Sequence, residues 1–280
     1  MWRLVSAAAR RGQPLGGVSR GPAAIRRWLP EVAEHHEVDL TKDVNAWYDA
    51  LSVCTTVERV LRREGDPVLV IGGDHSLSAG SVLATRRVYP DAKVLWIDAH
   101  ADVNTFLGSP SGNAHGMPLA ALCGHNSDFV RFSSLFDVLD PADLTYIGLR
   151  DVDEGEAEWI DAQRRHGLTA HTMHDLRRDG VRATVDAVRD AVGDAPVHLS
   201  FDVDVLDPGL APGTGTPVPG GMRRRELATV LSVLRTLNIK CLDLVEVNPD
   251  LDAEDERTAR IAASIARDLR NPHRLGEVIW

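Results

Sequence analysis

Two aspartates and a histidine at alternate positions form a segment of this sequence that is suited to binding a cation. Asp98, His100 and Asp102 directly follow the apolar run 93–97, which is typical of a buried parallel strand. In an extended backbone, side chains alternate between the faces of the strand, so we expect these three groups to point the same way. Polar groups gathered on one face make a poor core and a good set of metal ligands.

Two further strand ends carry the same kinds of side chain. Asp202 and Asp204 follow the run 196–199 with the same alternation, and His75 follows the run 68–71. Open α/β sheets bind ligands outside the carboxyl ends of their strands, so we expect the functional site there. An isolated Asp-x-Asp is more often a helix cap or a turn, and an isolated histidine is usually structural. Three such segments, each after a buried strand, favour a site.

The candidate ligands are all oxygen and nitrogen donors, a set that suits Mn²⁺, with Co²⁺, Ni²⁺, Fe²⁺ and Zn²⁺ as alternatives. They are His75, Asp98, His100, Asp102, Asp202 and Asp204. Two divalent cations would balance the four carboxylates, whereas one would leave a net anion in a partly desolvated place. Charge balance thus predicts a binuclear centre, which lowers the pKa of a bridging water and supplies hydroxide near neutral pH. A cationic substrate would then restore neutrality.

The composition argues against several classes of partner. The 280 residues include 41 acidic and 31 basic residues, and the formal net charge of −10 disfavours a nucleic-acid partner. No run approaches the roughly 18 apolar residues of a membrane-spanning helix. The 3 cysteines show no metal-type spacing, so we expect a reducing, cytoplasmic location. Residues 1–30 are rich in arginine, as in a transit peptide, but their strand and helix pattern favours folded structure.

Strand-like and helical patterns alternate along the whole chain. Strand patterns lie near residues 2–7, 37–40, 68–72, 94–98, 144–149, 168–173, 196–202 and 239–247. Helical patterns lie near residues 22–28, 45–64, 76–88, 156–166, 181–192, 223–237 and 255–269. This alternation predicts an α/β fold with a parallel sheet and helices on both faces. Because no linker or composition break divides the chain, we expect residues 1–280 to form one domain.

Segments 72–76, 98–102 and 200–208 resemble the signature motifs of the ureohydrolase family, the arginase and agmatinase group. The resemblance extends from residues 12–18 to residues 246–249. It implies a three-layer α/β/α sandwich with a mostly parallel eight-stranded sheet, and two Mn²⁺ ions per chain. Members of this family hydrolyse guanidinium compounds to urea and an amine, which agrees with the cationic substrate expected from charge balance.

By this resemblance, the two metal ions share two bridging carboxylates. One ion takes His75, Asp98, Asp102 and Asp202, and the other takes His100, Asp98, Asp202 and Asp204, with Asp98 and Asp202 bridging. The hydroxide between them attacks the guanidinium carbon. Asp102 resembles the carrier of the proton for the leaving amine, and His115 resembles the proton shuttle to solvent. Glu246 would pair with the guanidinium group in bidentate geometry, and Thr216 would hydrogen-bond the same end of the substrate.

Two long loops, 103–117 and 207–221, follow acidic segments and are expected to form the walls of the substrate pocket. The first loop resembles that of the arginase branch, in which neutral donors hold the α-carboxylate of an amino acid. These donors are Asn104, Ser109 and Ser111, with Asn113 beside them, and by the same resemblance Asp153 and Glu156 hold the α-ammonium group.

The resemblance therefore implies a manganese enzyme that converts L-arginine and water to L-ornithine and urea. It also implies a homo-oligomer, since trimers and hexamers are common in the family. One alternative keeps the chemistry and changes the substrate to agmatine or guanidinobutyrate. A second is a non-catalytic relative that binds arginine, and a third is a single-zinc deacetylase of related architecture, which predicts one metal ion per chain.

Overall fold

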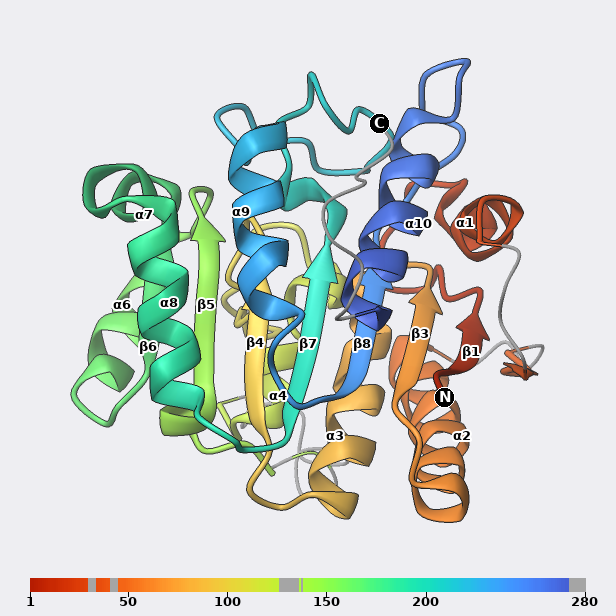
Figure 1. Ribbon diagram of the computed structural model, residues 1–280, viewed down its shortest axis with the longest axis horizontal. Coiled ribbons are helices and arrows are strands. Elements are labelled where there is room, and N and C mark those ends of the chain that lie inside the picture. Colours follow the sequence, from red (N-terminus) through yellow and green to blue (C-terminus); the bar gives the residue numbers. More distant parts are fainter. Residues whose placement is uncertain (30–33, 41–44, 126–135, 137, 272–280) are drawn as a thin grey trace.

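In the residues that the computed structural model describes, eight parallel strands form one sheet (Figure 1). The strands are β1 (Arg3–Ala7), β2 (His35–Glu37), β3 (Val68–Gly72), β4 (Lys93–Ile97), β5 (Leu144–Leu149), β6 (Thr169–Thr172), β7 (Val197–Asp202) and β8 (Ile239–Val245). Their order across the sheet is β2-β1-β3-β8-β7-β4-β5-β6, and all neighbours are parallel. The structure describes all residues except 30–33, 41–44, 126–135, 137 and 272–280.

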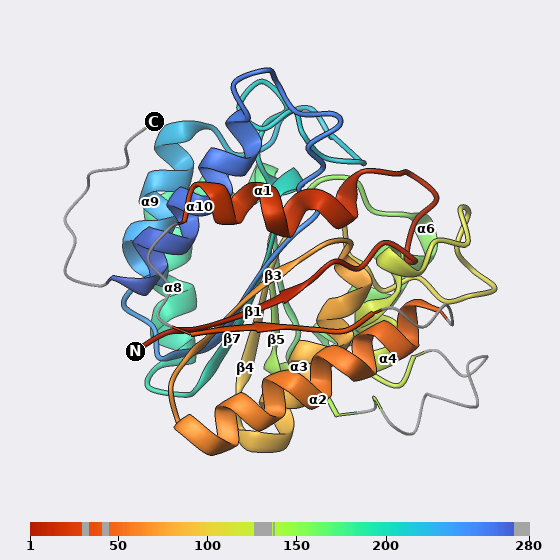
Figure 2. The same ribbon diagram turned by 90° about the vertical axis from the view of Figure 1, so that its right-hand side faces the viewer.

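Helices cover both faces of this sheet, which Figure 2 shows nearly edge-on. One face packs against α1 (Gly21–Arg27), α7 (Met173–Asp179), α8 (Val181–Val192), α9 (Arg224–Leu234) and α10 (Arg257–Arg270). The other face packs against α2 (Ala46–Glu64), α3 (Ser78–Val88), α4 (Pro118–Leu122) and α6 (Glu154–Arg164). Because both of their faces are covered, β3 and β7 are buried along their whole length.

The predicted fold class, a three-layer α/β/α sandwich, is confirmed, and the sheet is parallel throughout the described strands. Two of the described α-helices were not predicted. Helix α4 has only 5 residues, too few for a helical period to be recognised. Helix α7 begins inside the predicted strand 168–173, because Thr172 Oγ1 accepts a hydrogen bond from Asp175 N (3.1 Å) and ends β6 there. None of the described helices combines the length and the apolar composition that crossing a bilayer requires.

Candidate metal centre

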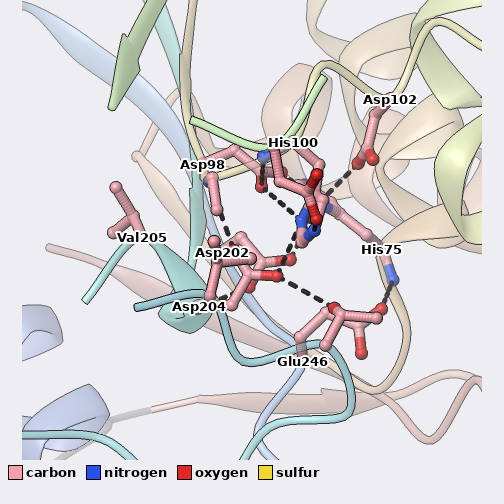
Figure 3. Close-up of polar contacts among 12 residues, drawn as sticks. His75, Asp98, His100, Asp102, Asp202, Asp204, Val205 and Glu246 are labelled. Atoms are coloured by element: carbon pink, nitrogen blue, oxygen red, sulfur yellow. Dashed lines mark hydrogen bonds and ion pairs between the residues drawn. The ribbon is translucent and has the colours of Figure 1, made fainter. Parts of the chain in front are cut away.

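The carboxyl ends of four neighbouring strands meet at one cluster of charged side chains (Figure 3). Asp98 directly follows β4, Asp202 is the last residue of β7, and Glu246 directly follows β8. His75 begins a short 3-10 helix, His75–Leu77, just after β3. Strands β3, β8, β7 and β4 are consecutive in the sheet, so their ends lie side by side.

The chain turns after β4 instead of continuing as a strand. β4 ends at Ile97, and Asp98 Oδ1 accepts a hydrogen bond from His100 N at 2.7 Å. Asp102 has φ 52°, in the left-handed region that non-glycine residues rarely adopt. The expectation that an extended backbone aligns Asp98, His100 and Asp102 is therefore wrong. A tight turn directs these side chains to the cluster.

A second turn brings Asp202 and Asp204 together. The 3-10 helix Val203–Val205 follows β7, and Asp202 Oδ1 accepts a hydrogen bond from Asp204 N at 2.8 Å. Burial, together with the charges of Asp204 and Asp98, raises the pKa of Asp202 well above its ordinary value. Keeping all of these carboxylates ionised therefore requires positive charge close to them.

The ring of His75 faces three carboxylates. Its Nδ1 lies 3.1 Å from Asp98 Oδ2, 2.9 Å from Asp102 Oδ2 and 3.1 Å from Asp202 Oδ2. This nitrogen is buried and makes no hydrogen bond with any residue that the structure describes. A nitrogen lone pair and three carboxylate oxygens around one point are the donor set of a divalent cation, which would also satisfy the nitrogen.

The ring of His100 faces a second group of carboxylates. Its Nδ1 lies 3.0 Å from Asp204 Oδ2 and 3.5 Å from Asp98 Oδ1. Two ligand sets result, His75–Asp98–Asp202 and Asp98–His100–Asp204, and within each set the donor atoms lie within 4.8 Å of one another. Because Asp98 belongs to both sets, the residues fit two adjacent cations with one shared carboxylate.

Two side chains behind the cluster orient the ring of His75, and neither was singled out from the sequence. The Trp96 ring stacks on the His75 ring with centroids 4.2 Å apart, and Trp96 Nε1 donates to Asp98 Oδ2 at 3.1 Å. Ser200 Oγ lies 2.8 Å from His75 Nε2, so the other ring nitrogen is left to face the carboxylates. Trp96 and Ser200 each precede a candidate ligand by two positions, which is the signal that could have identified them.

The cluster borders a cavity of about 200 Å³. The cavity is lined by His75, His100, Asp102, Asp202 and Asp204 from the cluster, by the predicted proton shuttle His115, and by six residues of the predicted substrate-binding set: Asn104, Ser111, Asn113, Asp153, Glu156 and Thr216. Three predicted site residues are not part of the described lining: Asp98, Ser109 and Glu246. Ser109 Oγ instead accepts a hydrogen bond from Gly112 N at 3.0 Å, inside its own loop.

The residues predicted to hold an α-amino acid are linked to one another. Asn104 Nδ2 donates to Asp153 Oδ2 at 2.8 Å. Glu156 Oε1 accepts from Val103 N at 3.1 Å, and its Oε2 accepts from Asp153 N at 3.0 Å. Burial raises the pKa of Glu156 to about 7. Glu156 therefore ties the start of loop 103–117 to the first turn of α6 in addition to lining the cavity.

Glu246 lies behind the cavity with donors on both carboxylate oxygens. Its Oε1 accepts from His75 N at 2.8 Å and lies 3.1 Å from His115 Nδ1. Its Oε2 accepts from Gln13 Nε2 at 2.6 Å. Gln13 was not predicted as a site residue, although the segment 12–18 contributed to the family resemblance. The backbone of Glu246 has φ 63°. Glu246 is therefore, after Asp102, the second residue of the cluster with a left-handed backbone.

Arg150 holds the turn that carries Asp204. Its Nη2 donates to Asp204 O at 2.6 Å and to Val218 O at 2.8 Å, and its Nη1 donates to Val205 O at 3.2 Å. In the same region, Thr216 Oγ1 donates to Asp204 Oδ2 at 3.1 Å. Loop 207–221 is therefore tied to a candidate ligand both by a guanidinium group and by a hydroxyl group.

A third group of metal-competent side chains, His198, Cys241 and Asp243, lies in the interior on β7 and β8. Asp243 Oδ2 accepts from Ser81 Oγ at 2.6 Å and lies 3.0 Å from His198 Nε2. These groups satisfy one another by hydrogen bonds, so we assign them to the packing of α3 on the sheet.

The comparisons with known proteins agree with this geometry. A family model described as Arginase family matches residues 3–270. The chain belongs to the arginase family. As a member of the arginase family it is a hydrolase, and its two overlapping ligand sets are candidates for the binuclear metal site that this membership implies.

Several of the similar proteins are themselves named arginases. The arginase of Coccidioides posadasii is 43% identical over 217 residues, which are 73% of this chain and 66% of the fungal protein. Arginase-1 of Rattus norvegicus is 35% identical over 285 residues, covering 92% of this chain and 87% of the rat protein. The solved structure of arginase from Bacillus caldovelox superposes with a TM-score of 0.88 at 31% identity, covering 98% of this chain and 99% of that one.

Proposed function

We propose that this arginase-family chain hydrolyses L-arginine to L-ornithine and urea, with two Mn²⁺ ions per chain. The observation that carries the proposal is the pair of ligand sets that share Asp98 at the edge of a cavity lined by neutral and acidic side chains. The named arginases among its relatives support the choice of substrate. Residues 1–280 as one domain, a homo-oligomeric assembly and a cytoplasmic location stay predictions.

Six residues supply the donors for the two ions in this proposal. They are His75, Asp98, His100, Asp102, Asp202 and Asp204. When bound, two divalent cations supply hydroxide near neutral pH by lowering the pKa of a shared water. Oxygen and nitrogen donors without thiolate suit Mn²⁺, and two such ions neutralise the charge of the four carboxylates.

The neutral and acidic side chains that line the cavity outside the metal cluster are assigned to the α-amino acid group. Asn104, Ser111 and Asn113 line the cavity with neutral donors for the α-carboxylate, and Ser109 accepts a hydrogen bond from Gly112 N within the same loop. Asp153 and Glu156 supply negative charge for the α-ammonium group. A substrate with both groups thus meets a complementary partner at each, whereas agmatine lacks the carboxylate.

The metal cluster, with His115, Thr216 and Glu246, is assigned to the guanidinium group and to proton transfer. The leaving amine must be protonated, because an amide anion is a poor leaving group; Asp102 is assigned to carry this proton. His115 lines the cavity and is assigned to exchange protons with solvent. Glu246 is assigned to pair with the guanidinium group, and Thr216 to hydrogen-bond the same end of the substrate.

Urea release from a panel of guanidino compounds tests the proposal. The Mn²⁺-loaded protein is incubated with L-arginine, agmatine and guanidinobutyrate, and its metal content is measured in parallel. We expect two metal ions per chain and the highest kcat/KM with L-arginine. Equal or better turnover of agmatine would replace the arginase assignment with the agmatinase alternative, and no urea from any compound at full metal occupancy would favour a non-catalytic binder.

A further inference from the structure

We propose that Gln13 is a positioning residue for the guanidinium end of the substrate and acts through Glu246. The inference rests on the proposed function, because that function assigns Glu246 to the guanidinium group. Gln13 Nε2 donates to Glu246 Oε2 at 2.6 Å, although the two residues are 233 positions apart in the sequence. Gln13 is 9% exposed and Glu246 is 1% exposed, so water competes little for this hydrogen bond.

The backbone of the residue before Gln13 is held by two hydrogen bonds. Gly12 N donates to Asp74 Oδ2 at 3.0 Å, and His115 N donates to Gly12 O at 3.1 Å. A Cβ at position 12 would collide with the carboxylate of Asp74, so this close approach requires glycine. The side chain of Gln13 therefore starts from a backbone with little freedom, which keeps its amide in reach of Glu246.

The amide of Gln13 has a defined orientation. A Cβ built on Gly215 would lie 2.8 Å from Gln13 Oε1 and 3.9 Å from Gln13 Nε2. The amide oxygen thus points toward loop 207–221, and the amide nitrogen points toward Glu246. Because an ionised carboxylate only accepts hydrogen bonds, the nitrogen is the atom that must face it.

The donors on the two oxygens of Glu246 fix the plane of its carboxylate. Oε1 is held by His75 N and lies against His115 Nδ1, whereas Oε2 is held by Gln13. Among the described residues, the Gln13 side chain makes no other hydrogen bond, so its substitution leaves the other contacts of the site in place. A planar guanidinium group pairs with a carboxylate only in a shared plane, so the loss of one restraint weakens that pairing.

The test compares recognition of the guanidinium end with recognition of the α-amino acid end of the substrate, in two variants and one control. Gln13→Leu removes the donor at similar size, and Gln13→Glu keeps the shape but sets a second carboxylate against Glu246. Leu15→Ala, at a 44% exposed position of the same segment, is the matched control. For each Mn²⁺-loaded protein we would measure kcat and KM for L-arginine, metal content and the inhibition constant of L-norvaline. Norvaline has the α-amino acid group and the methylene stem but no terminal nitrogen.

We expect Gln13→Leu to lower kcat/KM for L-arginine roughly ten- to a hundredfold, in the range of a lost hydrogen bond to a charged group. Gln13→Glu should lower it further. In both variants the metal content should be unchanged and the norvaline inhibition constant should change less than twofold, and Leu15→Ala should match the wild type. If Gln13→Leu does not fold, Gln13→Glu alone decides the question by the same comparison.

Two results would overturn the inference. A parallel rise in the norvaline inhibition constant would mean that Gln13 supports the whole pocket and not its guanidinium end. Unchanged kinetics in both Gln13 variants would mean that Glu246 needs no such restraint. A wild-type protein that releases no urea from any guanidino compound would instead refute the proposed function itself, so the two failures are distinguishable.

Discussion

Asn104 Nδ2 lies 2.8 Å from Asp153 Oδ2, so the residue assigned to the α-carboxylate directly contacts a residue assigned to the α-ammonium group. The two recognition elements are therefore one hydrogen-bonded unit, although they lie on loop 103–117 and at the start of α6. Disturbing either residue should affect recognition of the whole α-amino acid group while sparing the chemistry at the metal cluster.

Asn104→Ala should lower kcat/KM for L-arginine roughly ten- to a hundredfold, because the variant loses a donor and leaves Asp153 without its neighbour. The kcat/KM for agmatine, which has no α-carboxylate, should change less than about threefold. Steady-state urea release with both substrates checks this, with Leu107→Ala, at a 77% exposed position of the same loop, as the control. Equal losses for both substrates would show that Asn104 does not distinguish them.

Asp204→Ala should empty or weaken the metal site that His100 shares and lower kcat by several orders of magnitude, because activation of water then depends on one cation. Metal analysis after dialysis should give about one ion per chain, alongside the urea assay. Asp207→Asn is a matched control, since Asp207 accepts hydrogen bonds from Gly209 N and Gly220 N and faces neither ligand set. Two tightly held ions in Asp204→Ala would contradict its role as a ligand.

His115→Asn should lower kcat roughly ten- to a hundredfold while both metal ions stay bound, in line with the loss of acid–base help. His115 lines the cavity but belongs to neither described ligand set, which is why the metal content should not change. Added imidazole should restore part of the activity. If the variant lost its metal instead, the assignment of His115 to proton transfer would be wrong.

The His115–Glu246 pair should make the stability of the metal-free protein depend on pH. Burial lowers the pKa of His115, but the hydrogen bond and charge of Glu246 outweigh it and raise the pKa to about 9. Because the folded pKa lies above the unfolded value of about 6.5, the stabilisation is full below pH 6.5 and is lost as pH rises through 9. Urea unfolding of wild type and His115→Asn should differ by about 2 kcal/mol at pH 6 and converge by pH 10. A constant difference would exclude this titration.

Arg150→Met should weaken the metal site that contains Asp204. The guanidinium group donates to the carbonyl oxygens of Asp204, Val205 and Val218. Its removal takes a charged donor from all three acceptors, of which Val205 O keeps the hydrogen bond from Met222 N at 2.9 Å. We expect a loss of about 3 kcal/mol in stability and a measurable fall in affinity for the second Mn²⁺. Calorimetric Mn²⁺ titration checks this, with Arg182→Met, which removes only an exposed ion pair with Asp186, as the control. Unchanged affinity would show that the turn holds without Arg150.

The fold could be predicted from the sequence because its signal is periodic and repeated. Continuous apolar runs such as 93–97 indicated buried parallel strands, and the structure places β4 over those residues. The short helices α4 and α7 gave no such signal. The capping box formed by Thr172 and Asp175 starts α7 within the segment whose pattern predicted a strand.

The sequence predicted which residues form the candidate site better than it predicted how the backbone brings them together. Strand alternation suggested that Asp98 and Asp102 share a direction, but turns and a left-handed backbone at Asp102 bring them to the cluster. Gln13 could not be found from its own neighbours, because its partner Glu246 is distant in the chain and a single buried amide has no spacing to recognise. Residues that act through a partner distant in the sequence can be identified only from the folded structure.

The left-handed conformations of Asp102 and Glu246 have a consequence for the whole molecule. Each conformation costs on the order of 1 kcal/mol relative to glycine, so glycine would relieve backbone strain at both positions. Such a protein would lack a carboxylate at each of two places where the proposed chemistry needs one. An effort to raise the thermal tolerance of this protein should therefore leave both positions unchanged. The backbone strain at each position is the cost of placing a carboxylate there.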